Sequence, residues 1–144
     1  SFLFLVGPDE ENIGLKLQQS KNIIIHEFTT TPEDFMASCD LLCLPSYREG
    51  FGNVVIEAAA SGMPSIVSDI YGLSDFVIPN KTGFVHKVGD IDGMVKLFRM
   101  LYKDKLLVKN IGEKARASVT KDFDFKSISK YWLAFYKNLI SKLA

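Results

Sequence analysis

The sequence is poor in the residues that tie a small fold together covalently. Its 144 residues include two cysteines, Cys39 and Cys43, both in one short apolar segment. With His26 and His86 far away in the sequence, they do not form a zinc-binding spacing. Free cysteine in such surroundings behaves as a small hydrophobe, as in proteins of a reducing compartment. We therefore expect core cysteines, no disulfide framework and no metal site.

The chain also lacks an excess of either charge. Seventeen basic residues balance seventeen acidic ones, so no overall field attracts a polyanion and nucleic acid is not expected as a partner. No apolar run approaches the ~20 residues that span a bilayer. The length suits a single domain. Because Ser1 is followed at once by the buried-strand pattern FLFLV, we interpret the chain as a fragment.

Short apolar runs alternate with amphipathic stretches along the chain. The runs resemble strands covered on both faces, and they lie at residues 2–6, 23–25, 41–44, 65–67 and 83–85. Helices are predicted at 32–39, capped by Thr31, and at 54–61, capped by Asn53. Three further helical segments follow at 92–103, 105–120 and 125–143. This order predicts the α/β class, with a doubly wound parallel sheet and right-handed crossovers.

Ligands of such sheets bind at the carboxyl ends of the strands, and the loop at residues 45–53 lies at such an end. Gly50 and Gly52 let its backbone turn tightly and approach a ligand. The following helix presents free N–H groups and its positive dipole end, which suits a diphosphate. One glutamate, Glu49, lies in the loop, and Glu57 lies on the helix, where it can accept hydrogen bonds from a ribose. We favour this phosphate-and-sugar loop over a purely structural turn.

The stretch from Glu49 to Glu57, Glu-Gly-Phe-Gly-Asn-Val-Val-Ile-Glu, resembles the E-x7-E motif of the retaining family-4 (group 1) glycosyltransferases. These enzymes have the GT-B fold. Other segments agree with the family, among them FLFLVGP at 2–8, CDLLCLPS at 39–46, EAAASGMP at 57–64 and the aromatics at 132–136. Within the family, these motifs most resemble those of bacterial O-antigen and polysaccharide transferases. The resemblance implies the Rossmann-like C-terminal half of a GT-B enzyme, which binds the donor.

The resemblance also implies a role for each matching residue. Glu57 would bind the nucleotide ribose, and Glu49, the catalytic candidate, would lie against the donor sugar. The backbone of the motif would hold the diphosphate and sugar hydroxyls, at Gly50, Phe51, Gly52, Asn53 and Val54. The loop of His26, Glu27 and Phe28 would lie against the base, although His26 fits a strand end equally well. The donor would be a UDP-sugar, carrying a hexose or an N-acetylhexosamine such as GalNAc, with no metal or other cofactor.

Parts of the family's domain are expected outside this chain. The first strand and helix, with an arginine and a lysine that neutralise the diphosphate, would precede Ser1, as would the acceptor domain. We therefore expect the fragment to be inactive alone. The full enzyme would extend a lipid-linked glycan, with retention of configuration, in surface polysaccharide (O-antigen or lipopolysaccharide) biosynthesis. It would act at the cytoplasmic face of the membrane, with peripheral membrane contact left open.

Two features have competing interpretations. Asp90-Ile-Asp92 reads as D-x-D, a metal–nucleotide motif, but it directly precedes a helical pattern, and we favour an aspartate cap. The segment 125–143 mixes aromatics with lysines like an interfacial membrane helix. We favour a surface helix packed on its own sheet and on the missing domain.

The competing functional class is a non-catalytic nucleotide-binding or regulatory α/β module. A receiver-like domain would need a phosphate-accepting aspartate at the end of a mid-chain strand, where this sequence has Pro45-Ser46. A nicotinamide dehydrogenase would need G-x-G-x-x-G after a strand, and the chain has none. The donor-binding domain is therefore the leading hypothesis.

Overall fold

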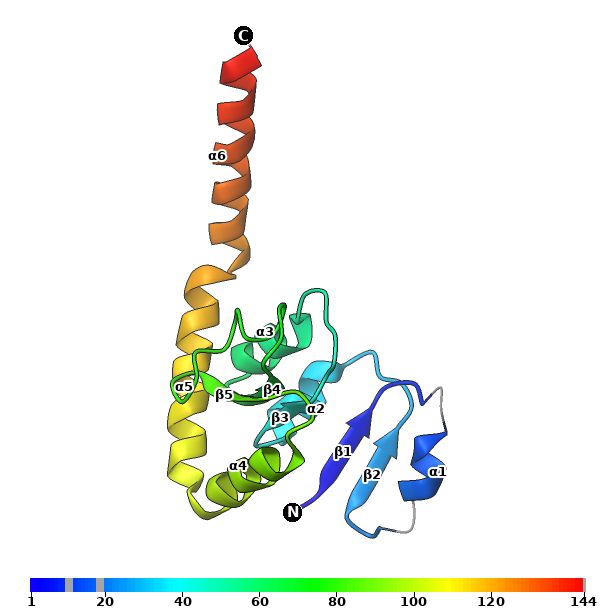
Figure 1. The fold of residues 1–144 in the computed structure, drawn as a ribbon. Coiled ribbons are helices and arrows are strands. Elements are labelled where there is room, and N and C mark those ends of the chain that lie inside the picture. The colour runs from blue at the N-terminus through cyan, green and yellow to red at the C-terminus, as the bar shows by residue number, and fades with distance from the viewer. Residues whose placement is uncertain (10–11, 18–19, 144) are drawn as a thin grey trace. The chain divides into compact units, whose positions relative to one another are not determined.

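The computed structural model describes residues 1–9, 12–17 and 20–143, and they fall into two compact units, 1–34 and 35–144. All strand pairs in both units are parallel. A helix lies between each pair of successive strands from β1 to β4, whereas β4 and β5 are joined by a loop, and three helical segments follow β5 (Figure 1). The predicted α/β class with parallel sheets and C-terminal helices is confirmed.

The first unit pairs β1 (Leu3–Val6) with β2 (Ile23–His26) in register from Leu3↔Ile23 to Val6↔His26. Between them lies the short helix α1 (Ile13–Leu17), which the sequence analysis did not predict. Asp9 fixes its start, because its two carboxylate oxygens accept the backbone N–H groups of Ile13 (2.9 Å) and Gly14 (2.6 Å). The sequence feature that could have predicted α1 is Asp9, which lies four residues before an apolar stretch.

The second unit contains a three-stranded sheet in the order β3-β4-β5. The strands are β3 (Leu42–Leu44), β4 (Ser65–Ser68) and β5 (Gly83–His86), each within one residue of its predicted bounds. Helix α2 (Pro32–Ser38) crosses the unit boundary, and α3 (Asn53–Ala60) joins β3 to β4. Helices α4 (Ile91–Lys103), α5 (Lys105–Asp122) and α6 (Phe125–Leu143) complete the chain.

Helices cover both faces of the second unit's sheet. Ile66 of β4 and Phe84 of β5 pack with Ile111 of α5, together with Leu101 and Val108. On the other face, Val67 packs with Val55 of α3 and with Leu73 and Val77. Strand β4 is buried at all four positions. This double cover explains why the strands of the second unit read as unbroken apolar runs. In the first unit the expectation of cover on both faces was wrong, since both β1 and β2 have exposed apolar side chains.

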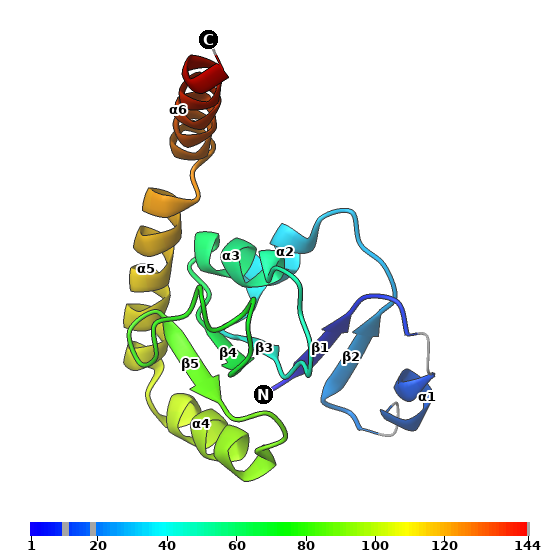
Figure 2. The ribbon, with the colours of Figure 1, turned by 45° about the horizontal axis from the view of Figure 1, so that its top comes forward.

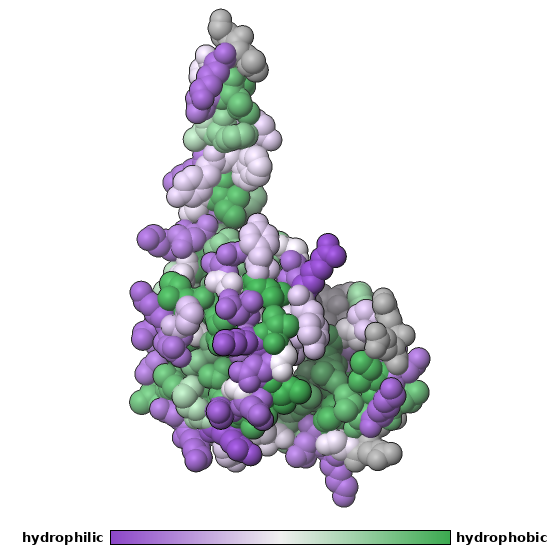
Figure 3. Space-filling model, viewed as in Figure 1, coloured by the Kyte–Doolittle hydropathy of each residue, from purple (hydrophilic) through white to green (hydrophobic). Residues whose placement is uncertain are grey.

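Helix α6 does not pack on the sheet of its own unit, so that part of the prediction was wrong. Ser127 and Ile128 are half-buried, and the other side chains described along the helix are exposed. Figures 1 and 2 show α6 continuing beyond α5, and Figure 3 shows apolar side chains along it. In the described part of the chain, no helix is long and apolar enough to cross a bilayer.

Candidate functional site

Two loops at the carboxyl edge of the second unit's sheet are joined to each other. One follows β3 and contains residues 45–52, and the other follows β4 and contains residues 69–76. The backbone N–H of Gly52 donates to the carbonyl oxygen of Gly72 at 2.9 Å. Because β3 and β4 are parallel neighbours, both loops leave the sheet at the same edge. The loop that carries Glu49 is therefore supported by the loop from the next strand.

The glycines of these loops divide into structural and open positions. A Cβ at Gly52 would stand 2.7 Å from Leu73 Cδ2 and 2.8 Å from the Gly72 carbonyl oxygen. Gly72 has φ +84°, and a Cβ there would stand 2.8 Å from the Gly50 carbonyl oxygen. At Gly50, in contrast, a Cβ would have no atom within 4 Å. The turn interpretation thus accounts for Gly52, and Gly50 is the position where a ligand can come close to the backbone.

Glu49 is half-buried and held in place from within its own loop. The hydroxyl of Ser46 donates to Glu49 Oε1 at 2.8 Å. This contact fixes one carboxylate oxygen and leaves the second without a hydrogen bond to any described residue. A carboxylate held in this way is oriented before a ligand arrives, which favours a positioned polar contact.

The N-terminus of α3 is free of a side-chain cap. Gly52 is the N-cap residue and Asn53 is the first helical residue, so the predicted capping by Asn53 was wrong. The N–H of Asn53 donates to the Phe51 carbonyl oxygen at 2.8 Å, and that of Gly52 is used by Gly72. Within the described residues, the N–H groups of Phe51 and Val54 have no acceptor. Of these four amides, two are therefore available for a diphosphate.

Glu57 lies on α3 and is exposed. The structure gives its carboxylate no ion pair or hydrogen bond with any described residue. An ionised carboxylate accepts hydrogen bonds only, so two neighbouring hydroxyls are suitable partners for it. Its position on the helix that starts from the Glu49 loop agrees with the predicted ribose contact, which stays a prediction.

Three aromatic rings in sequential contact support the loop of Glu49. Phe51 meets Phe76 edge to face with ring centroids 4.7 Å apart, and Phe76 meets Phe123 at 5.4 Å. Phe76 belongs to the loop after β4, and Phe123 is the C-cap of α5. Sequence reasoning missed this packing because the three rings come from distant segments with no shared spacing.

The three residues predicted to lie against the base belong to the first unit. His26 ends β2, and its carbonyl oxygen accepts the backbone N–H of Gly7 at 3.0 Å. Glu27 and Phe28 follow in the loop, and the Phe28 side chain is 72% exposed. An exposed ring on the loop after a strand is compatible with base stacking, and the role stays a prediction.

Asp90 caps a helix, as we expected. Its Oδ1 accepts the backbone N–H of Gly93 at 2.8 Å at the start of α4. Among the described residues, no group of three or more His, Cys, Asp or Glu side chains could hold a metal ion. The D-x-D reading is thereby replaced by a cap, and metal independence of the reaction stays a prediction.

Cys43 on β3 is half-buried, as is Cys39, so neither is a fully buried core residue as we expected. Its Sγ lies 3.8 Å from the Sδ of Met94 on α4. Burial raises the pKa of the Cys43 thiol above its ordinary value, because the thiolate loses its hydration. Both cysteines are free. A buried thiol that resists ionisation is a poor nucleophile.

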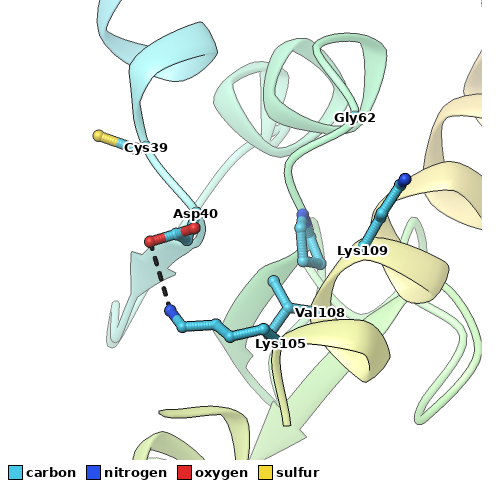
Figure 4. A pocket seen from close by; sticks show the side chains of 7 residues that line it. Cys39, Asp40, Gly62, Lys105, Val108 and Lys109 are labelled. Atoms are coloured by element: carbon cyan, nitrogen blue, oxygen red, sulfur yellow. Dashed lines mark ion pairs between the residues drawn. The ribbon is translucent and has the colours of Figure 1, made fainter.

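A hollow lies at the opposite, amino edge of the same sheet (Figure 4). Asp40 precedes β3 and Pro64 precedes β4, and both line it together with Lys105 and Lys109 of α5. Lys105 Nζ lies 3.5 Å from Asp40 Oδ2, with both side chains largely exposed. An exposed pair of this kind contributes little free energy. No predicted site residue lines this hollow, so the candidate site is the carboxyl-edge loops.

The comparison with known proteins agrees with this geometry. Residues 2–118 match the model of the family "Glycosyl transferases group 1". The capsular polysaccharide biosynthesis glycosyltransferase CapM of Staphylococcus aureus is 29% identical over 133 residues, which are 92% of this chain and 35% of CapM.

A second relative comes from Campylobacter jejuni. It is an N,N'-diacetylbacillosaminyl-diphospho-undecaprenol alpha-1,3-N-acetylgalactosaminyltransferase, 26% identical across 99% of this chain and 38% of its own length. The fold matches Anabaena Alr3699/HepE, crystallised with UDP and glucose, with a TM-score of 0.86 at 22% identity, over 95% of this chain and 40% of HepE. The chain thus spans a little over a third of the relatives' length. It belongs to the group 1 glycosyl transferases, and its fold matches part of GT-B glycosyltransferases.

Proposed function

We propose that this chain is the donor-binding half of a retaining glycosyltransferase that uses a UDP-sugar. The observation that carries the proposal is the start of α3, which has no side-chain cap and directly follows the loop of Glu49. The free N–H groups of Phe51 and Val54 and the positive end of the helix dipole attract a diphosphate. Gly50 leaves open space beside them for the donor.

Each residue of the motif has a place in this proposal. The α3 N-terminus holds the diphosphate and stabilises the charge that develops on it as the glycosidic bond to the sugar breaks. Glu57 accepts hydrogen bonds from the ribose hydroxyls. Glu49, held by Ser46 at 2.8 Å, lies against the sugar as it passes through an oxocarbenium-like transition state. The sugar keeps its anomeric configuration, and no metal takes part.

Two relatives support the choice of donor and acceptor. The name of the Campylobacter jejuni relative describes transfer of N-acetylgalactosamine to a sugar on diphospho-undecaprenol, and HepE was crystallised with UDP and glucose. We propose a hexose or N-acetylhexosamine, such as GalNAc, as the transferred sugar. The acceptor is a lipid-linked glycan of surface polysaccharide synthesis, on the cytoplasmic face of the membrane. CapM, a capsular polysaccharide transferase by name, supports this setting.

The rest of the protein supplies the acceptor domain and the first strand and helix of the donor domain. Helix α6 supports this part of the proposal, since it presents an apolar surface that no described residue covers. Ile128, Tyr131, Trp132 and Phe135 line a hollow of about 300 Å³ on it. The helix carries four lysines and no acidic residue. We assign its apolar face to the acceptor domain, and a membrane surface is the alternative occupant.

The test is an assay of the full-length enzyme with UDP-GalNAc, UDP-GlcNAc, UDP-glucose and a GDP-sugar, each with a lipid-diphosphate-linked sugar as acceptor. We expect transfer from a UDP-sugar that survives chelation of divalent metals. Proton NMR of the product gives its anomeric configuration, which should equal that of the donor. An inverted product would contradict retention. Binding of a nucleotide without transfer to any acceptor would favour the non-catalytic module.

A further inference from the structure

The loop of Glu49 carries a second pair of side chains, which the proposed donor site leaves without a function. The hydrogen bond from Ser46 to Glu49 closes a short loop with Tyr47 and Arg48 at its tip. Tyr47 is 80% exposed, and Arg48 is exposed as well. Among the described residues, Arg48 has no ion pair. The tip therefore presents an aromatic ring and an unpaired guanidinium beside a fixed carboxylate.

Tyr71 lies on the neighbouring loop, next to the residue that joins the two. Its ring is 82% exposed. The following residue, Gly72, accepts the N–H of Gly52, and a Cβ on it would stand 2.8 Å from the carbonyl oxygen of Gly50 and 3.2 Å from that of Glu49. Asp75 holds this turn by accepting the Gly72 N–H at 3.0 Å. The fold thus places two exposed tyrosines and one arginine on two joined loops at the edge of the candidate site.

This set of side chains fits a sugar that carries a phosphate. The face of a tyrosine ring takes the C–H face of a pyranose, which is apolar, and the phenol remains available to its hydroxyls. A guanidinium binds phosphate through two parallel hydrogen bonds, which a lysine cannot reproduce. We propose that Tyr47, Arg48 and Tyr71 form a glycosyl-phosphate subsite of the enzyme. The inference rests on the proposed function and adds a subsite to it.

The glycosyl phosphate can come from either substrate, because both a nucleotide sugar and a lipid-diphosphate-linked acceptor contain one. The α3 N-terminus already offers amides to the donor diphosphate. Arg48 lies before Glu49 in the loop, and those amides lie after it. Competition with UDP separates the two sources, since UDP fills the donor's phosphate positions only.

The test uses the full-length enzyme and N-acetylglucosamine 1-phosphate as the probe, observed by saturation-transfer difference NMR. The variants are Arg48→Gln, Arg48→Lys, Tyr47→Ala and Tyr71→Ala. The matched controls are Arg99→Gln and Tyr102→Ala, which change exposed residues of α4 outside the two loops. We expect saturation of the pyranose ring protons, reduced at least threefold in both tyrosine variants. Arg48→Gln should weaken probe binding about tenfold, because a charge-assisted contact is lost.

The outcomes of the UDP competition assign the source. Displacement of the probe by UDP places the subsite on the donor, and continued binding at saturating UDP places it on the acceptor. The inference is overturned if all four variants stay within twofold of the native enzyme, or if the native enzyme binds UDP but not the probe. An enzyme that does not bind UDP at all contradicts the proposed function and the subsite together.

Discussion

Gly52 and Gly72 are bonded across two loops, with the N–H of Gly52 2.9 Å from the carbonyl oxygen of Gly72. Neither residue can gain a side chain without meeting the other loop. The position of Glu49 therefore depends on a loop from the neighbouring strand, which no local sequence motif encodes. Substitution of either glycine should therefore affect the stability of the fold more than the transfer reaction.

Replacement of Gly72 by alanine should destabilise the protein more than a positive φ alone explains. The methyl group would occupy a left-handed backbone position and stand 2.8 Å from the Gly50 carbonyl oxygen, so we expect a loss of about 2–4 kcal/mol. Gly89→Ala is the control, with φ +74° and open space around it, and should cost about 1 kcal/mol. Urea unfolding measures both. Equal losses would mean that the loop contact contributes nothing.

Gly50→Ala should separate ligand binding from folding. Its Cβ position is open, so the unfolding free energy should change by less than about 0.5 kcal/mol. Binding of a UDP-sugar should weaken, because a methyl group then stands where the donor approaches the backbone. Gly52→Ala should instead lower the free energy of unfolding, because its methyl group would meet the loop after β4. Unchanged donor binding in a folded Gly50→Ala enzyme would remove Gly50 from the site.

Asp90→Ala should remove a helix cap and leave transfer unaffected. The Asp90 carboxylate accepts the Gly93 N–H at 2.8 Å, and losing such a cap costs about 1 kcal/mol. Asp92→Ala, in the first turn of the same helix, should cost about half as much because it loses only the dipole interaction. Thermal unfolding gives the stabilities. Loss of transfer in a folded Asp90→Ala enzyme would instead support the interpretation of D-x-D as a metal–nucleotide motif.

Alkylation of Cys43 should depend on pH in a way that reflects its burial. Burial raises the pKa of this thiol, so the neutral form persists to higher pH in the folded chain than in the unfolded one. Any stability linked to this group is present below the unfolded pKa and is lost as the pH rises through the folded pKa. Iodoacetamide labelling, followed by mass spectrometry, should show that the alkylation rate of Cys43 rises at a higher pH in the folded protein than in the protein unfolded in urea. Coincident curves would contradict the burial of the Cys43 thiol.

Most of the fold could be predicted because its signals are local. Each of the five strands was within two residues of its predicted start and end, because short apolar runs mark strands. The predicted cover on both faces is found for β4, which is fully buried, but β1 and β2 keep exposed side chains. Helix α1 was missed because it is short and depends on Asp9. The environment of α6 was mistaken because its amphipathic pattern shows that a face needs cover, not which partner supplies it.

The sequence predicts which residues form the candidate site, and their roles stay predictions, whereas the contacts around them could not be predicted. The spacing of Glu49 and Glu57 identified the loop and the helix. The use of the Gly52 amide by Gly72 and the chain of rings from Phe51 to Phe123 are tertiary contacts between distant segments. No period or spacing along the sequence contains such information, so these contacts required the structure.

The central claim, that Glu57 binds the ribose of a nucleotide sugar, is tested most directly by calorimetric titration of the full-length enzyme with UDP. We expect Glu57→Gln to weaken binding about tenfold or more, because hydrogen bonds to a charged group are worth about 1.5–3 kcal/mol. Glu113→Gln, an exposed change on α5, should stay within twofold of the native enzyme. Equal UDP affinity in the native and Glu57→Gln enzymes, or no UDP binding by the native enzyme, would contradict the account.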